Sequence, residues 1–253
     1  MKTPSTTTNL RFAGKCTIVL GGTSGIGLAT CRQLLQHGAD RVVAYGRSPE
    51  RCQAAVQALE APPNFCAQSL DILNRDALQA AFAAQDGGFD YLVVAATGGP
   101  RAMGPFMEMD MDGFQNSFAK LWGYANAVRF GVPHMRNGGA VVLVSGSPAR
   151  KCKPGFVALS CVGAAVENLV RATATELGPK GIRVNGVSPG LIDTPMFDAK
   201  GKGKAAFLQQ ATANNPIARP GTADEVAAGI LSLLDNDFIT GTVLDVDGGL
   251  VIP

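Results

Sequence analysis

The sequence lacks the features that define several common protein classes. Its six cysteines form no CxxC pair and its two histidines do not lie at metal-ligand spacing, so neither a zinc site nor a disulfide framework is predicted. Its apolar runs are shorter than the roughly 18 residues that cross a bilayer, and its polar start, MKTPSTTTNLR, is not that of a secretory signal. We therefore expect a cytoplasmic protein with reduced thiols, no metal and no membrane partner.

Charged residues are few and evenly mixed. The 22 Lys and Arg residues nearly balance the 20 Asp and Glu residues, and they are scattered along the chain, which argues against a nucleic-acid surface. The 253 residues are 46% hydrophobic and show no linker, repeat or low-complexity segment. This composition predicts one globular α/β domain over residues 12–253, preceded by a polar extension over residues 1–11.

The most informative stretch is CTIVLGGTSGIGLA, at residues 16–29. Its first five residues are apolar or β-branched and suit a buried parallel strand. Gly21, Gly22, Gly25 and Gly27 then form a turn that opens a helix. Backbone N–H groups and the helix dipole favour a phosphate at such a turn, so we predict that a dinucleotide pyrophosphate binds there. A tight turn that binds nothing is the structural alternative.

Strands and helices alternate along the rest of the chain. Strands are predicted over 16–20, 41–45, 65–70, 91–96, 140–144, 182–187 and 242–246, and helices over 50–59, 74–84, 112–135 and 156–177. A further helix begins at the capping box Thr222-x-x-Glu225. This alternation predicts an α/β fold of the Rossmann type: a doubly wound, parallel seven-stranded sheet with helices on both faces.

Four segments carry a resemblance to a known family. The glycine turn reads Gly-x-x-x-Gly-x-Gly, and with Asp71-Ile72, GPKGIRVNGVSPGLIDTP at 178–195 and ITGTVLDVDGG at 239–249 it resembles the short-chain dehydrogenase/reductase family. The resemblance covers almost all of the chain from Phe12 onward, although a shared fold does not establish a reaction. It implies a nicotinamide cofactor held by the following residues: Gly21, Thr23, Ser24, Gly25, Ile26, Gly27, Arg47, Ser48, Asp71, Ile72, Ala96, Pro189, Gly190, Ile192 and Thr194.

The end of the second predicted strand favours NADP(H) over NAD(H). In this fold an acidic residue at that place bonds the ribose 2′-hydroxyl and repels a 2′-phosphate. Here the sequence reads Tyr45-Gly46-Arg47-Ser48, so glycine replaces the carboxylate and a guanidinium suited to phosphate follows. Ser48 and Thr23 are predicted as further donors, and a surface Arg47 without a ligand is the alternative.

The chain departs from the family where the resemblance implies an Asn-Ser-Tyr-Lys catalytic set. An ungapped match from Ser145 onward places Gly146 at the Ser position, Leu159 at the Tyr and Gly163 at the Lys, and Lys120 stands where Asn is usual. In the family the Tyr hydroxyl exchanges a proton with the substrate oxygen, helped by the Lys ammonium. These roles are vacant or altered here, and we expect a wider and more apolar cleft than in ordinary members.

Four residues remain as candidates for catalysis: Ser145, Ser147, Lys120 and Tyr124. The serines either hold a substrate carbonyl or simply end a strand and start a helix. Tyr124 follows Lys120 by one helical turn, so the ammonium is predicted to lower the tyrosine pKa and form a substitute proton relay. A solvated side chain is the alternative for Lys120, as it is for Arg101, Lys151 and Lys153 near the expected cleft.

We predict an NADP(H)-dependent oxidoreductase that reduces an activated C=O, C=N or C=C bond of a small hydrophobic metabolite, because such an acceptor needs little proton assistance. Two other classes stay open, a non-redox isomerase or cyclase of secondary metabolism and a cofactor-binding pseudoenzyme. Consumption of NADPH with a panel of acceptors separates the oxidoreductase from both.

The sequence also predicts an oligomeric assembly and a mobile lid over the substrate cleft. Family members pair through two long helices and the last strand, so the resemblance implies a homo-oligomer, a dimer or homotetramer, built on residues 112–135, 156–177 and 242–246. After Pro195, the run Lys200-Gly201-Lys202-Gly203-Lys204 predicts a mobile lid that attracts an anionic or electron-rich substrate. A solvated loop is the alternative.

Overall fold

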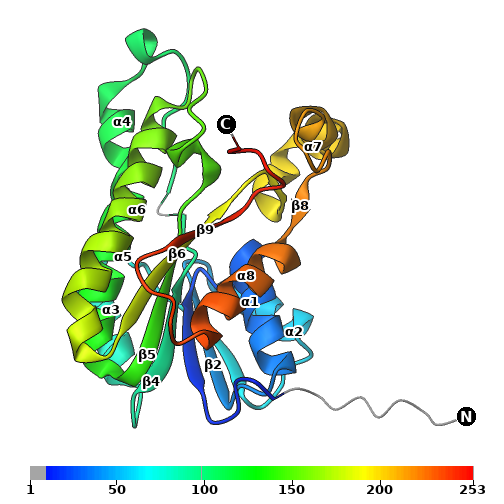
Figure 1. The fold of residues 1–253 in the computed structure, drawn as a ribbon. Helices are drawn as coiled ribbons and strands as arrows, with labels where there is room; N and C mark the ends of the chain where they lie inside the picture. The colour runs from blue at the N-terminus through cyan, green and yellow to red at the C-terminus, as the bar shows by residue number, and fades with distance from the viewer. Residues whose placement is uncertain (1–9, 98, 253) are drawn as a thin grey trace, which may run out of the picture.

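Seven parallel strands form the central sheet of the computed structural model, which describes residues 10–97 and 99–252 (Figure 1). Their spatial order is β3-β2-β1-β4-β5-β6-β9. The strands are β1 Cys16–Leu20, β2 Arg41–Gly46, β3 Phe65–Ser69, β4 Phe89–Val94, β5 Met135–Val144, β6 Arg183–Pro189 and β9 Val243–Val246. The predicted parallel seven-stranded sheet is confirmed, and its order reverses between β1 and β4, where sheets of this kind bind ligands.

Helices cover both faces of the sheet (Figure 1). One layer contains α1 Gly25–Gln36, α2 Pro49–Ala58 and α8 Ala223–Asp235, and the other contains α3 Arg75–Ala83, α4 Met111–Ser117, α5 Ala119–Gly131 and α6 Val157–Leu177. Each layer packs on its own apolar cluster. The capping box of α8 is confirmed, since Glu225 N donates to Thr222 Oγ1 and Thr222 N donates to the Glu225 carboxylate. The polar extension predicted over 1–11 lies outside the described residues except for Leu10 and Arg11.

The single helix predicted over residues 112–135 is wrong. α4 ends at Ser117, α5 ends at Gly131, and the short 3-10 helix η2 Val132–His134 leads into β5. Ser117 Oγ donates back to Gly113 O and accepts from Ala102 N, both at 2.8 Å, and such back-bonding bends helices. Pro133 cannot continue α5 because it has no N–H to donate. The apolar spacing concealed both interruptions because it continues across them.

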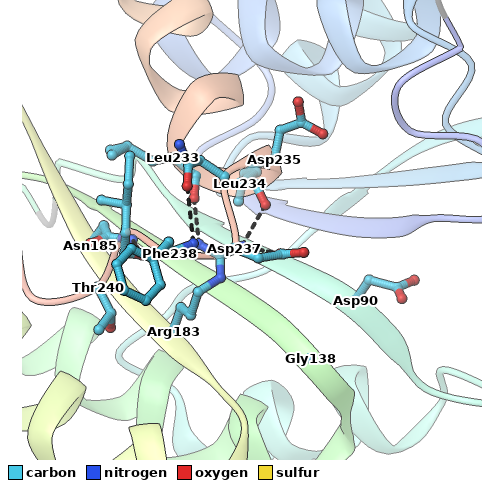
Figure 2. Close-up of polar contacts among 12 residues, drawn as sticks. Asp90, Gly138, Arg183, Asn185, Leu233, Leu234, Asp235, Asp237, Phe238 and Thr240 are labelled. Atoms are coloured by element: carbon cyan, nitrogen blue, oxygen red, sulfur yellow. Dashed lines mark hydrogen bonds and ion pairs between the residues drawn. The ribbon is translucent and has the colours of Figure 1, made fainter.

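Charged groups at the amino-terminal end of the sheet are paired. Figure 2 shows Arg183 of β6 reaching the C-terminal end of α8, where its guanidinium donates to Leu233 O at 2.7 Å and Leu234 O at 2.6 Å. Asp90 of β4 accepts from Cys16 N at 2.8 Å and from the Arg136 guanidinium at 2.9 Å. These bonds fasten a helix end and a strand start to the sheet, and they satisfy carbonyl groups that a helix terminus otherwise leaves open.

One stretch among the described residues, Val157–Lys180, is long and apolar enough to cross a membrane by length and composition. It comprises α6 and the turn η4 Gly178–Lys180. Val166, Val170 and Ala174 on this helix pack into the apolar cluster beside the sheet. That packing is typical of a core helix.

Candidate cofactor and substrate site

A cavity of about 640 Å³ lies at the carboxyl ends of β1 to β4. Its walls come from the turn after β1, the end of β2, the residues that follow β3 and β4, and the segment after the short strand β7 Ile192–Asp193. Cofactor and ligand pockets commonly measure about 300–1,000 Å³. The cavity therefore has the size and the place expected of a nucleotide site.

Twelve of the predicted cofactor residues line this cavity: Gly21, Thr23, Ser24, Gly25, Ile26, Gly27, Arg47, Ser48, Asp71, Ile72, Ala96 and Thr194. The other three lie outside its lining. Pro189 ends β6, Gly190 N donates to Val246 O at 3.0 Å, and Ile192 is buried where β7 pairs with β8 Gly221–Thr222. The Pro-Gly turn thus packs on the segment that ends β9.

The glycines of the first turn are required by close backbone contacts. Gly21 has a φ of +83°, and a Cβ on it would lie 2.6 Å from Ala96 N. A Cβ on Gly27 would lie 2.1 Å from Gly21 O. Ser24, the N-cap of α1, makes no side-chain capping bond to any described residue, so the first-turn N–H groups keep their capacity for a ligand. This cradle fits a pyrophosphate.

The edge of the cavity beside β2 is cationic. Arg47 and Arg51 both line it, and both side chains are exposed. A Cβ on Gly46 would lie 2.3 Å from Thr23 Oγ1, so a larger side chain at this position requires Thr23 to move. The edge therefore combines two guanidinium groups with a position at which a carboxylate would have to displace the Thr23 side chain.

The sequence-based prediction omitted Arg51, and it assigned Ser48 a role as a phosphate donor that stays a prediction. Arg51 lies in the first turn of α2, four residues after Arg47 in the chain, and this second arginine close to Arg47 was the available signal. Ser48 lines the cavity, but its Oγ donates to Glu50 at 2.5 Å and accepts from Arg51 N at 3.2 Å, so it is engaged in capping α2. Thr97 and Met196, also not predicted, complete the wall near Thr194.

Lys120 and Tyr124 share the buried side of α5, as predicted. Lys120 Nζ donates to Ser145 O at 3.0 Å and lies 5.3 Å from the centroid of the Tyr124 ring, whose hydroxyl donates to Val144 O at 3.0 Å. Burial, and to a smaller extent Arg101, lower the pKa of Lys120 to about 7. Burial raises the pKa of Tyr124, so the predicted lowering of the tyrosine pKa is wrong. The pair offers an amine that titrates near neutrality.

The two candidate serines are buried and serve different elements. Ser145 Oγ donates to Gly163 O at 3.2 Å and to Glu167 Oε1 at 3.3 Å, so it joins the end of β5 to α6. Ser147 begins the 3-10 helix η3 Ser147–Ala149, and its carbonyl accepts from Arg150 N at 3.0 Å. The Ser145 hydroxyl therefore has a structural role, whereas a catalytic role for the Ser147 hydroxyl stays a prediction.

The space beside Gly163 on α6 is occupied by a residue of another element. A Cβ on Gly163 would lie 2.9 Å from Ala149 Cβ and 3.3 Å from Ala149 N, because η3 packs directly on the helix. Arg150, next in the chain, pairs with Glu167 at 3.1 Å and with Asp245 at 2.7 Å. The prediction of a wider cleft is therefore wrong at this position, since the chain closes over the small residue.

A second cavity, of about 670 Å³, lies in the loop between β4 and α4. The chain passes from the wall of the first cavity at Thr97 to the wall of the second at Pro100. Arg101 lines the second cavity and is half-buried. Gly104 N donates to Gly155 O at 3.0 Å, which ties this loop to the segment that precedes α6.

The segment predicted as a lid is helical. It forms the 3-10 helix η5 Pro195–Gly203 and α7 Lys204–Thr212. Lys204 Nζ lies 2.7 Å from carboxylate oxygens of both Asp193 and Asp198, and Lys200 Nζ lies 3.8 Å from the centroid of the Phe207 ring. Lys204 is therefore paired with carboxylates, whereas Lys200 is exposed, as the alternative of a solvated loop has it. Movement of the segment stays a prediction.

The chain matches the family model described as enoyl-(acyl carrier protein) reductase over residues 21–251. It is 33% identical over 252 residues to the 3-oxoacyl-[acyl-carrier-protein] reductase FabG of Thermotoga maritima, covering 96% of this chain and 100% of that protein. It is 31% identical over 249 residues to the oxidoreductase asL5 of Sarocladium schorii, covering 95% and 97%. The NADPH-bound structure of a short-chain oxidoreductase from Pseudomonas aeruginosa PAO1, described as containing an atypical catalytic center, superposes with a TM-score of 0.87 at 32% identity over 95% of this chain and 98% of that one.

Proposed function

The chain belongs to the short-chain dehydrogenase/reductase family, and on that premise we propose that it is an NADP(H)-dependent oxidoreductase. The observation that carries the cofactor assignment is the pairing of Arg47 and Arg51 at the cavity edge, with Gly46 pressed against Thr23. A guanidinium fork suits a ribose 2′-phosphate, whereas the carboxylate of an NAD site would have to displace the Thr23 side chain here. The NADPH-bound Pseudomonas relative supports the same cofactor class.

When bound, the cofactor supplies or accepts a hydride, and this chain provides its binding site. The cradle of Gly21, Ser24 and Gly27 would hold the pyrophosphate, Arg47 and Arg51 the 2′-phosphate, and Asp71-Ile72 the adenine side. Thr194 and Ala96 lie further along the same cavity wall. Holding the cofactor in one orientation supplies part of the barrier reduction through proximity alone.

Titration of NADP+ and NAD+ tests the cofactor assignment. We expect NADP+ to bind more tightly, and Arg47→Ala to weaken NADP+ binding by about 10- to 100-fold while NAD+ binding stays unchanged, because a charge-assisted bond to the phosphate is lost. Arg171→Ala, which removes an exposed guanidinium of α6, is the matched control. Equal affinity for the two cofactors would show that the assignment is wrong.

We propose further that the substrate is a small hydrophobic molecule with an activated C=O, C=N or C=C bond, and that Lys120 moves the proton. The amine donates to the carbonyl of Ser145, directly after β5, and burial lowers its pKa to about 7. Tyr124 positions it by holding its ring beneath the ammonium. Met103 and Met109 in the second cavity support an apolar substrate.

Oxidation of NADPH with carbonyl, imine and enone acceptors tests the reaction. Lys120→Met should lower kcat by about 10²- to 10⁴-fold and remove an ionisation near pH 7 from the pH profile, since the variant has no proton to give. Tyr124→Phe keeps the ring beneath the ammonium and should have a smaller effect. If product forms without oxidation of NADPH, the protein is an isomerase or cyclase and not an oxidoreductase. If the cofactor binds but no product forms, the protein is a pseudoenzyme.

We propose a homo-oligomer as the working form. β9 lies at the edge of the sheet with Leu244 36% exposed, and Trp122 on α5 is 61% exposed. An uncovered edge strand invites pairing with another chain, and a two-fold partner would cover it. Light scattering at micromolar concentration should give the mass of a dimer or tetramer, and a monomer mass would contradict the proposal.

A further inference from the structure

Arg150 joins three elements at the carboxyl end of the sheet. Its Nε lies 3.1 Å from Glu167 Oε2 on α6, and its Nη1 lies 2.7 Å from Asp245 Oδ2 on β9. Arg150 follows η3 directly, and its backbone N donates to Ser147 O at 3.0 Å. These two ion pairs, which we call the Arg150 clamp, therefore hold the end of η3 against a helix and a strand from elsewhere in the chain.

Of the three elements, η3 depends most on the Arg150 clamp. α6 is anchored by Val166 and Val170 in the apolar cluster, and β9 pairs with β6. Among the described residues, η3 is a single turn of three residues that pairs with no strand. Ala149 N donates to Gly146 O at 3.0 Å, and a turn this short has little stability of its own.

The Arg150 clamp places two carboxylates beside one guanidinium. Glu167 is buried and also accepts from Ser145 Oγ at 3.3 Å, and Asp245 Oδ1 is enclosed without a hydrogen-bond partner among the described residues. The cost of desolvating such charges offsets most of their attraction, so the net gain in stability is small. What the clamp provides is one fixed place for η3 relative to α6 and β9.

η3 begins beside the wall of the cofactor cavity. Val94 at the end of β4 is the register partner of Leu143 on β5. The chain leaves β4 through Ala96, which lines the cavity, and it leaves β5 through Ser145, whose carbonyl accepts from Lys120 Nζ. Because neighbouring parallel strands end at the same edge of a sheet, η3 starts next to the cavity wall and to the amine proposed to move the proton.

The hydroxyl of Ser147, the first residue of η3, is available to a ligand. It makes no hydrogen bond to a described residue, and it is not among the enclosed polar atoms that have no partner. The Ser145 hydroxyl, in contrast, donates to Gly163 O and to Glu167. Of the two serine hydroxyls at this edge of the sheet, that of Ser147 therefore keeps its donor.

We propose that Arg150 is a positioning residue of the oxidoreductase site, and that the Ser147 hydroxyl, held by η3, donates to the carbonyl oxygen of the substrate. A donor fixed in advance stabilises the negative charge that develops on this oxygen during reduction, and a mobile donor loses that advantage. The inference rests on the proposed function, because it needs a reducible substrate. The attachment of η3 by the Arg150 clamp can be measured without one.

Oxidation of NADPH with the carbonyl acceptors tests the inference in Ser147→Ala, in Arg150→Met and in the variant that carries both changes. Each single change should lower kcat/KM by about 10- to 100-fold. The combined variant should stay within about twofold of the weaker single variant, because a displaced hydroxyl contributes nothing more that its removal could take away. NADPH binding should change by less than about twofold, since neither residue lines the cofactor cavity.

Arg136→Met is the matched control. Arg136 pairs with Asp90 at the opposite end of the sheet, and the side chains are 39% and 9% exposed, against 34% and 7% for Arg150 and Glu167. Both variants should lose stability in urea, but Arg136→Met should keep the kcat/KM of the parent. Equal activity of the two variants would overturn the inference, and so would losses from Ser147→Ala and Arg150→Met that multiply in the combined variant.

Amide exchange separates this inference from the proposed function. The amides of residues 150 and 151 donate to Ser147 O, and Arg150→Met should speed their exchange by at least about tenfold while α6 exchanges as in the parent. Unchanged exchange there, in a variant of an active parent, overturns the inference alone. A parent that oxidises no acceptor overturns the proposed function, and Arg150 then has no reaction to serve.

A second variant covers the case in which Arg150→Met does not fold. Arg150→Met combined with Glu167→Gln leaves one unpaired carboxylate fewer in the buried network, and the glutamine oxygen still accepts from Ser145 Oγ. This variant should show the same loss of kcat/KM and the same insensitivity to Ser147→Ala. Parent-like activity in it would overturn the inference.

Discussion

The two ends of the central sheet differ in whether their charged side chains have partners. At the amino ends, Arg183 donates to carbonyls of α8 (Figure 2), and Asp90 is paired with Arg136. At the carboxyl ends, Arg150 is paired with Glu167 and Asp245. The other cations there, Arg47, Arg51, Arg101 and Lys120, have no carboxylate partner among the described residues. Satisfied charges hold the fold together, whereas unsatisfied charges keep their binding capacity for a ligand. The comparison assigns stability to one end of the sheet and binding to the other.

Arg183→Ala should produce the largest effect on stability. It removes donors from Leu233 O, Leu234 O and Ile239 O, which lie within 2.6–3.2 Å of the guanidinium. Ile239 O keeps its bond from Asn185 Nδ2 at 2.8 Å, but the loss of donors to Leu233 O and Leu234 O should lower the free energy of unfolding by about 3 kcal/mol. Urea denaturation measures this loss, and the affinity of the folded protein for NADP+ should stay within about twofold. A fall in cofactor affinity that matched the loss of stability would break the division between the two ends.

A change at the carboxyl end should alter cofactor binding more than stability. Gly46→Asp combined with Thr23→Ala places a carboxylate where Thr23 Oγ1 now lies 2.3 Å from the Cβ position. The carboxylate repels a 2′-phosphate and accepts from a ribose hydroxyl, so NADP+ binding should weaken by about 2 kcal/mol and NAD+ binding should strengthen. Thr23→Ala alone is the control. If the double variant kept the cofactor preference of the parent, the cavity edge beside β2 would not distinguish NADP+ from NAD+.

Lys120→Met sharpens the comparison through its pH dependence. The pKa of Lys120 is about 7 in the folded protein and near its ordinary 10.5 when unfolded, so between these values the unfolded chain binds a proton that the folded chain does not. The parent should therefore gain stability with rising pH by up to about 1.4 kcal/mol per unit from this group, and the variant should lack that gain. Unfolding at pH 7, 8 and 9 measures both slopes, with Lys151→Met as the control. Parallel slopes would show that Lys120 keeps an ordinary pKa.

The sequence predicted the scaffold well because its patterns are local. The glycine turn and the strand of residues 16–20 appear where expected, and the capping box of Thr222 and Glu225 forms. The break at Ser117 escaped notice because it depends on a bond from Ala102, a residue outside the helix. Likewise, the filling of space beside Gly163 comes from Ala149 on another element, and the raised pKa of Tyr124 comes from burial. Such features depend on tertiary packing, which spacing along one helix does not contain.

The smallest effect is expected where a charge at the carboxyl end does have partners. Lys204 bridges Asp193 and Asp198 in an exposed position, and exposed ion pairs contribute little and are screened by salt. Lys204→Gln should therefore leave the melting temperature unchanged but speed amide exchange in residues 195–203 by about two- to fivefold. Raising the salt concentration should have the same effect on the parent protein. Lys202→Gln removes an exposed lysine of the same run, for which the structure describes no ion pair, and it should change nothing. If the amide-exchange rates of both variants are equal, the ion pairs of Lys204 do not hold this segment in place. Lys204 would then resemble the unpaired cations at this end of the sheet.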